Sequence, residues 1–250
     1  CICVHLWFQN MTPIPHDIPL PLPLDRVLLQ AVIVVLFLAH IIFVNFTVGG
    51  SLFAVVFEMI GLRRPDFDTL ARRITATITV NKSLAVVLGV GPLLAINVLY
   101  TVYFYSANAL TGYAWISIVP LVTVAFLVMY AYKYSWDRFA HRKGLHIAIG
   151  SFSLLLFLIV PLIFLTNINL MLFPDRWTAV HGFLSALVLP NVLPRYAHFL
   201  LACIALTALF MLAYFTRAGF PVESTFQQLR RPTLRRLFYG IAGGATALQL

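Results

Sequence analysis

Two histidines stand out because they lie within, or at the edge of, long apolar stretches. His40 is thirteen residues into the stretch from Val27 to Leu62, which is roughly 20 Å along a helix that rises about 1.5 Å per residue. His198 opens a later apolar stretch and follows Arg195 by three residues. Ionisable groups are costly in lipid, and imidazole and arginine suit haem iron and haem propionates respectively. We predict that His40 and His198 bind haem iron and that Arg195 pairs with a propionate.

The residues around each histidine are consistent with a cofactor site. At about 100° per residue, several polar side chains share the helix side of His40; these are Thr47, Ser51 and Glu58. Ala202 and Ala205 follow His198 on its own face and leave room for a flat macrocycle. The alternative for His40 is a neutral imidazole hydrogen-bonded to a neighbouring helix. The alternative for His198 is an imidazole at the level of the lipid headgroups, with Arg195 extending to water.

Two further histidines are candidate cofactor ligands. His181 lies in the segment 174–194, in which we predict a short helix at the outer interface, and it is a spare ligand that could approach His198. His146 begins another apolar stretch directly after a basic segment. Its alternative role is that of a solvated or supporting side chain.

Carboxylates are scarce in the apolar stretches. No Asp or Glu occurs between Asp68 and Asp137. Proton transfer inside a membrane normally relies on buried carboxylates, and Glu58 is the one candidate within an apolar stretch. We therefore expect little buried proton chemistry.

The composition requires that a membrane surround these residues. The chain has 250 residues, of which 61% are hydrophobic and only 10% charged, and its mean hydropathy is +0.93. Soluble domains carry about 25% charged residues to cover their surface. A water-soluble globule is thereby excluded. The net charge of +9 then reports orientation in the bilayer, and we expect no nucleic-acid partner.

The apolar stretches predict an all-α fold, a polytopic membrane helix bundle with about six transmembrane helices, because lipid offers no backbone partners to open strands. Each span needs about 20 apolar residues. The predicted spans are 27–62, 84–105, 114–132, 147–173 and 199–215, with a sixth that starts near Leu237. The second span holds Gly89, Gly91 and Pro92, which either kink it enough to admit a cofactor or allow close helix packing.

Two regions differ in their organisation. Residues 1–24 form a proline-rich outer arm, whose five prolines remove amide donors and prevent a continuous helix. Residues 25–250 form the transmembrane haem-binding bundle. Because the sequence stops within an apolar stretch, we expect the natural polypeptide to continue beyond Leu250.

Positive charges alternate between the segments that join the spans. Thirteen lysines and arginines fall in the segments after the first, third and fifth spans, whereas the opposite segments hold little more than Arg26, Arg176 and Arg195. Basic segments remain on the cytoplasmic side of a membrane. We therefore predict an outside N-terminus for a multi-pass protein of a bacterial-type inner membrane.

Five short motifs follow one another in an order that is typical of a known family. They are His40-Ile-Ile-Phe-Val, Val48-Gly49-Gly50, Phe57-Glu58, Trp136-Asp137-Arg138 and Arg235-Arg236-Leu-Phe-Tyr-Gly-Ile-Ala. Together with His146 and His198, they resemble the first half of subunit I of cytochrome bd-type quinol oxidases over roughly residues 24 to 250. By this resemblance, His40 corresponds to the ligand of a high-spin haem and His198 to a ligand of a low-spin haem.

The resemblance implies a b-type haem subunit that passes electrons between membrane quinol or quinone and a partner. The cofactor would be haem b, and the partner a c-type cytochrome or iron–sulfur protein on the outer face, with a second membrane subunit possible. Oxygen-reducing members carry glutamates in the second and third helices, but the places around Asn97 and Thr123 hold no acid. One alternative is a genuine bd-type terminal oxidase in which Glu58 or another subunit handles protons. The other is a haem-free scaffold or transporter subunit.

Overall fold

The computed structural model describes residues 21–79 and 82–250, and within them it contains helices and no strand. The helices are α2 (Arg26–Gly61), α3 (Pro65–Ile78), α4 (Lys82–Leu99), α5 (Thr101–Thr111), α6 (Tyr113–Ile116), α7 (Ile118–Tyr134), α8 (Lys143–Leu172), η1 (Pro174–Ala179), α9 (Phe183–Leu187), α10 (Val192–Thr216), α11 (Val222–Thr225) and α12 (Arg231–Ala247). The predicted all-α class is confirmed. The proline-rich arm lies outside the described residues, apart from positions 21–24.

Among the described residues, four helices are long and apolar enough to cross a membrane, and the number of spans rises to as many as five if one bent pair counts as a span. The four are Arg26–Gly61, Tyr113–Tyr134, Lys143–Leu172 and Val192–Thr216, and the bent pair is Ala85–Leu99 with Thr101–Thr111, which meet at 111°. The chain is therefore an integral membrane protein of several passes. The predicted sixth span corresponds to α12, a helix of 17 residues with three arginines near its start. α12 is not one of the helices that are long and apolar enough to cross a membrane.

α2 is a single continuous helix, as the sequence predicts. Its 36 residues extend roughly 54 Å at about 1.5 Å per residue, well beyond a hydrocarbon core of about 30 Å. The Asp25 carboxylate caps its start by accepting hydrogen bonds from the backbone N–H of Val27 (2.8 Å) and Leu28 (3.3 Å). At the other end Pro65 occupies the first turn of α3, a position that proline favours, and the chain reverses.

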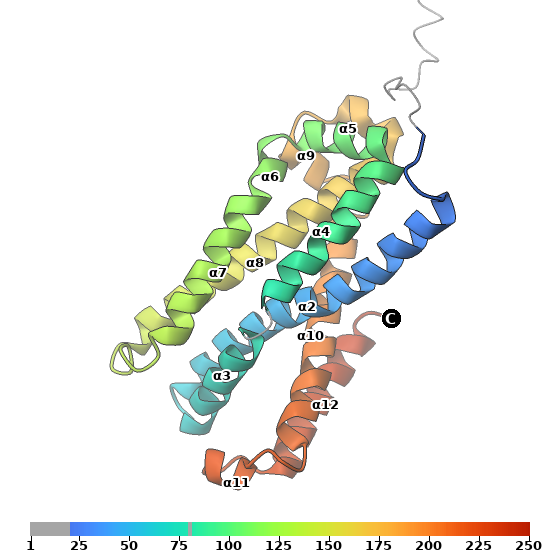
Figure 1. Ribbon diagram of the computed structural model, residues 1–250. Coiled ribbons are helices and arrows are strands. Elements are labelled where there is room, and N and C mark those ends of the chain that lie inside the picture. The colour runs from blue at the N-terminus through green and yellow to red at the C-terminus, as the bar shows by residue number, and fades with distance from the viewer. Residues whose placement is uncertain (1–20, 80–81) are drawn as a thin grey trace, which may run out of the picture.

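The helices surround α2 in three groups (Figure 1). α3 and α4 together run back along α2, α7 and α8 form an antiparallel pair, and α10 packs on α12. α2 contacts α3, α4, α8 and α10, so it borders all three groups. α5 and α9 lie across one end of the bundle, opposite α3 and α11.

Glycines allow two of these contacts to be very close. A Cβ at Gly49 of α2 would overlap the Thr207 hydroxyl and the main-chain carbonyl of Cys203 on α10. A Cβ at Gly150 of α8 would lie 2.7 Å from the Tyr132 ring on α7. Small residues bring helix backbones together in this way throughout membrane proteins.

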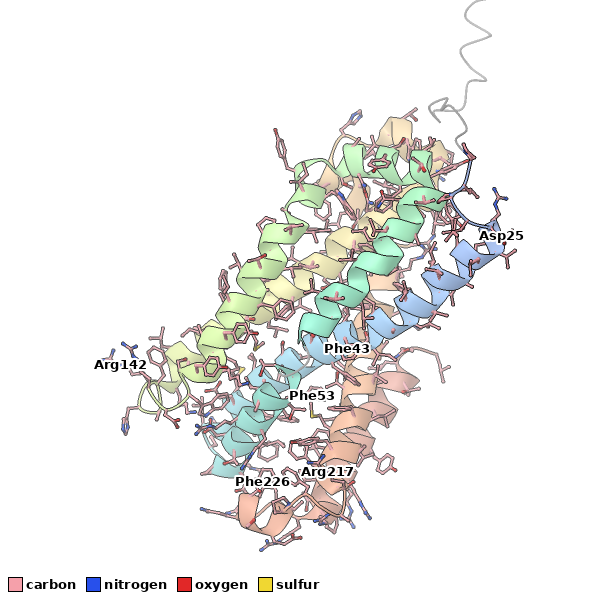
Figure 2. The ribbon with its side chains drawn as sticks, viewed as in Figure 1. Asp25, Phe43, Phe53, Arg142, Arg217 and Phe226 are labelled. Carbon is pink, nitrogen blue, oxygen red and sulfur yellow. The ribbon has the colours of Figure 1, made fainter. Side chains whose placement is uncertain are left out.

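The basic segments gather at one end of the bundle. Figure 2 shows Arg142, between α7 and α8, and Arg217, after α10, at the end opposite Asp25. The turn between α2 and α3 lies at the same end as these two arginines. The alternation of charge along the sequence therefore corresponds to two distinct ends of the fold.

Candidate functional site

His40 is half-buried on the side of α2 that faces α4. Its Nδ1 lies 2.9 Å from the carbonyl oxygen of Ala85. Because a carbonyl only accepts, Nδ1 carries the proton and donates it, and Nε2 keeps its lone pair. Within the described part of the chain, Nε2 has no hydrogen-bond partner. A main-chain carbonyl that fixes one imidazole nitrogen is the arrangement found behind metal-bound histidines, so the ring fits the role of an axial ligand.

The His40 ring lies directly against Gly89 of α4. A Cβ at this position would lie 2.8 Å from Cε1 and 3.1 Å from Nδ1 of the imidazole. Gly91 likewise admits the Leu36 side chain. Of the two predicted roles for these glycines, close packing is the one seen, and at Gly89 the packing partner is the candidate ligand itself.

His198 is exposed in an apolar groove between α2, α8 and α10, with a volume of about 520 Å³. The groove is lined by Phe37, Ile41, Asn45, Leu165, Pro194, Arg195, His198, Phe199 and Ala202. Apart from Asn45, its polar lining consists of one imidazole and one guanidinium, which is the donor set that a haem with propionates requires.

The two predicted ligands face different neighbours. Phe37 and Ile41 of α2 line the groove of His198, whereas His40 contacts Ala85 and Gly89 on α4. Two ligands of one iron would have to face each other across a single cavity. The geometry therefore does not fit His40 and His198 as the two ligands of one iron.

His181 and His198 have different neighbours in the structure. His181 is exposed just before α9, and its backbone N–H donates a hydrogen bond to the Ser185 hydroxyl at 2.8 Å. No hydrogen bond joins it to His198 within residues 21–79 and 82–250. The predicted short helix in this segment is present as α9, preceded by η1.

His146 is fully buried, and both of its ring nitrogens are engaged. Nδ1 lies 2.6 Å from Oε1 of Glu58, and Nε2 lies 2.8 Å from the carbonyl oxygen of Tyr132. Coordination of a metal by His146 would require one of these bonds to break. The arrangement instead makes His146 the partner of a buried carboxylate.

A cluster of polar side chains surrounds that carboxylate, which is completely inaccessible to solvent. The Tyr132 hydroxyl donates to Oε2 of Glu58 at 2.5 Å. Lys143 Nζ lies 3.4 Å from Oε1 of Glu58 and 2.6 Å from Oδ1 of Asp68. The indole N–H of Trp136 donates to the second Asp68 oxygen at 3.3 Å. We call Glu58, His146, Tyr132, Lys143, Asp68 and Trp136 the carboxylate cluster.

Sequence reasoning missed most of this cluster. It expected Glu58 to share a lined site with Thr47 and Ser51, but those hydroxyls donate to main-chain carbonyls of α2 itself, at 2.9 and 2.6 Å. His40 and Glu58 face different helices. Trp136 and His146 were recognised as a motif, but the sequence carried no signal that they meet Glu58.

A second buried carboxylate, Asp66 of α3, has a structural role. Burial disfavours its charged form, but its oxygens accept hydrogen bonds from the backbone N–H of Gln227 (2.9 Å), Gln228 (2.5 Å) and Leu229 (2.7 Å). These three donors and the nearby charge of Arg230 outweigh burial, and the pKa of Asp66 falls below its ordinary value. Asp66 thus ties α3 to the segment before α12.

Comparisons of the chain with protein-family models, with curated proteins and with solved structures found no match. Among the described residues, no three His, Cys, Asp or Glu side chains converge in a way that could hold a metal ion. His40, His198 and the carboxylate cluster are therefore the features whose geometry bears on function.

Proposed function

We propose that the protein is a b-type haem subunit of a membrane electron-transfer complex, an oxidoreductase component that passes electrons between quinol or quinone and a partner redox protein. The observation that carries the proposal is the apolar groove of about 520 Å³ in which His198 and Arg195 lie one helical turn apart. Haem, when bound, supplies one-electron transfer. The protein supplies the ligand, a counter-charge for the propionates and a water-poor environment.

Each candidate residue has a separate task. His198 presents an imidazole to the groove, and Arg195 provides a guanidinium for a carboxylate. At the second position the Ala85 carbonyl holds His40 in the tautomer whose Nε2 lone pair can coordinate iron. Gly89 leaves the space that the His40 ring needs.

The orientation follows from charge. The end that carries the basic segments would face the cytoplasm by the positive-inside rule, which puts the N-terminus and the start of α10 outside. His198, in the first turns of α10, would then lie near the outer face. A c-type cytochrome or iron–sulfur partner would dock there, and six passes of a bacterial-type inner membrane, with α12 as the sixth, complete the topology.

A pyridine haemochrome assay, which identifies the haem type, and a reduced-minus-oxidised spectrum of the untreated purified protein, which reports its spin state, test the proposal. We expect haem b in the wild type, loss of a low-spin absorbance band in His198→Ala, and an unchanged spectrum in His141→Ala, whose histidine lies in the exposed loop before α8. A wild-type protein without haem would refute the proposal and favour a scaffold or transporter subunit. An unchanged spectrum in His198→Ala would refute the assignment of the groove.

The second haem position has its own test. Gly89→Val would push the imidazole of His40 off α4 and separate Nδ1 from the Ala85 carbonyl. We expect this variant to lose the high-spin component while the low-spin band of His198 remains. Loss of neither component would mean that His40 only packs against α4.

A terminal oxidase is the second candidate function. The fully buried Glu58, which is bonded to His146 and Tyr132, provides a membrane carboxylate of the kind that proton-consuming chemistry needs. Quinol-driven oxygen consumption that is abolished in Glu58→Gln would favour it. A haem-replete protein that shows no quinol-driven oxygen consumption would favour electron transfer to a partner.

A further inference from the structure

The hydrogen bonds of His146 determine where its protons lie. Its Nε2 must carry a proton, because the partner at 2.8 Å is the carbonyl oxygen of Tyr132, which only accepts. Nδ1 lies 2.6 Å from Oε1 of Glu58. Two lone pairs at that distance would repel each other. One further proton therefore lies between Glu58 and His146, in a pair that is fully buried.

The charges around the pair balance only while that proton is present. With it, Glu58 and His146 together are neutral, and Lys143 and Asp68 cancel each other at 2.6 Å. Without it, the cluster has a net negative charge at a buried position, which is costly in a medium of low dielectric constant. The Tyr132 hydroxyl and Lys143 are the donors that would stabilise the carboxylate in that state. The pair is built to hold one proton and is able to release it.

A route to water runs through the same cluster. The side chains of Glu58 and His146 are 0% exposed, whereas those of Lys143 and Asp68 are 20% and 29% exposed. Lys143 Nζ bridges the two carboxylates, at 2.6 Å from Asp68 and 3.4 Å from Glu58. The Trp136 ring centroid lies 4.7 Å from the Lys143 ammonium and 4.6 Å from the His146 ring centroid, so the indole covers one side of the bridge.

The neighbouring ion pair between Arg72 and Asp137 does not enter the cluster. Arg72 of α3 donates to both oxygens of Asp137, at 2.8 and 2.7 Å, and these two side chains are 53% and 80% exposed. α2 contributes Glu58, α3 contributes Asp68, α7 contributes Tyr132, and α8 contributes Lys143 and His146. Among the described residues, Asp68, Tyr132 and Lys143 are therefore the titratable groups that the packed elements bring to the Glu58–His146 pair.

We propose that Glu58 and His146 form a buried proton-binding site that exchanges its proton with the aqueous phase through Lys143 and Asp68. In loading, water gives a proton to the Asp68 carboxylate. The Lys143 ammonium then gives one of its protons to Glu58 and takes the proton held by Asp68. The net change is one proton moved from water to the Glu58–His146 pair, with Lys143 and Asp68 returned to their charged forms. Unloading is the reverse.

This inference does not depend on haem. Glu58 and His40 are eighteen residues apart on one continuous helix, which is roughly 27 Å at about 1.5 Å per residue. The proton-binding pair is therefore remote from the candidate ligand on α2. Failure of the haem assay would leave the proton site in place, and the two proposals can be tested separately.

Infrared difference spectroscopy of the purified protein, transferred rapidly from H₂O to D₂O, tests the route. Bands of the buried pair are identified by their loss in Glu58→Gln. In the wild type we expect these bands to shift as deuterium replaces the shared proton. In Asp68→Asn the shift should have the same final amplitude but be at least tenfold slower. Lys143→Arg keeps the positive charge but cannot release a proton, so it should be slowed as well.

Asp137→Asn is the matched control, because Asp137 lies at the same end but bonds to Arg72 rather than to the cluster. It should exchange at the wild-type rate. Two results would overturn the proposal: pair bands that do not shift in the wild type, which would mean a static ion pair, or equal exchange rates in the wild type, Asp68→Asn and Lys143→Arg. Lys143→Arg retains the ion pair with Asp68, so the test survives if Asp68→Asn does not fold.

Discussion

Replacing Asp66 by alanine should release the segment that leads into α12. The Asp66 carboxylate accepts three backbone hydrogen bonds, at 2.9, 2.5 and 2.7 Å. A hydrogen bond to a charged group contributes about 1.5–3 kcal/mol, but these three share one carboxylate whose burial offsets part of the gain. We therefore expect a net loss of about 3 kcal/mol against local opening, which is about a hundredfold in the open population.

Limited trypsin digestion measures this population, because cleavage tracks the open fraction when opening is fast relative to cutting. The segment between α10 and α12 contains Arg217 and Arg230 as cleavage sites. Asp66→Ala should be cut there about a hundredfold faster than wild type. The control is Glu223→Ala in the same segment, because Glu223 is 62% exposed and forms a loose ion pair with Arg231 at 3.6 Å. Surface pairs contribute about 0–1 kcal/mol, so this variant should change the rate less than about fivefold.

The pH dependence follows from the lowered pKa of Asp66. Its stabilising contribution is complete above the ordinary value of 3.8 for an unfolded chain and is lost as pH falls through the lower folded-state pKa. The Tm difference between wild type and Asp66→Ala should therefore be constant from neutral pH down to about pH 4 and should close only below it. Equal cleavage of Asp66→Ala and Glu223→Ala, or a Tm difference that closes near neutral pH, would refute the reasoning.

Three further variants test other contacts, each by thermal unfolding in detergent. Gly49→Val should destabilise the protein by about 1–3 kcal/mol, since the valine side chain would overlap α10. Gly243 has open space around it, so Gly243→Val should not create this clash. Equal losses of stability in the two variants would contradict the close contact between α2 and α10. Tyr132→Phe should cost about 1–3 kcal/mol because Glu58 loses a buried donor, and an unchanged Tm would argue against that bond. Arg231→Lys should cost about 2 kcal/mol, because the guanidinium donates to the main-chain carbonyls of Thr216, Arg217 and Phe220, at 3.2, 2.8 and 2.6 Å, and an ammonium cannot span them. An unchanged Tm would exclude this role.

Hydrophobic periodicity and length were sufficient to predict the long helices. The continuous apolar stretch from Val27 to Leu62 predicts α2 within a residue at each end. The same reasoning failed after α4, where it continued one span to Tyr105 although the chain bends by 111° at Tyr100. No proline or glycine marks that bend, and most of the residues on both sides are apolar. The position of α5 across the end of the bundle depends on tertiary packing, which periodicity does not report.

The candidate site was predictable only where a single residue type carried the signal. A histidine deep in an apolar stretch marks His40, but its partner is the carbonyl of Ala85, and every residue has a carbonyl. Glu58 meets Tyr132 and His146 across 74 and 88 residues of sequence. A single sequence offers no measure of such pairings, so the carboxylate cluster could not be predicted before the packing of the helices was known.

The contact between α2 and α10 has a consequence for biogenesis. The Cys203 thiol donates to Oδ1 of Asn45 at 3.1 Å, and these residues are separated by 158 positions. During synthesis α2 leaves the ribosome long before α10 exists, so the Asn45 amide and the glycine surface beside it first face lipid or the insertion machinery without their partner. The nascent N-terminal helix must be retained in that unfinished state until the fourth long apolar helix arrives. Chains that stall before α10 is made should accordingly be substrates for membrane quality control.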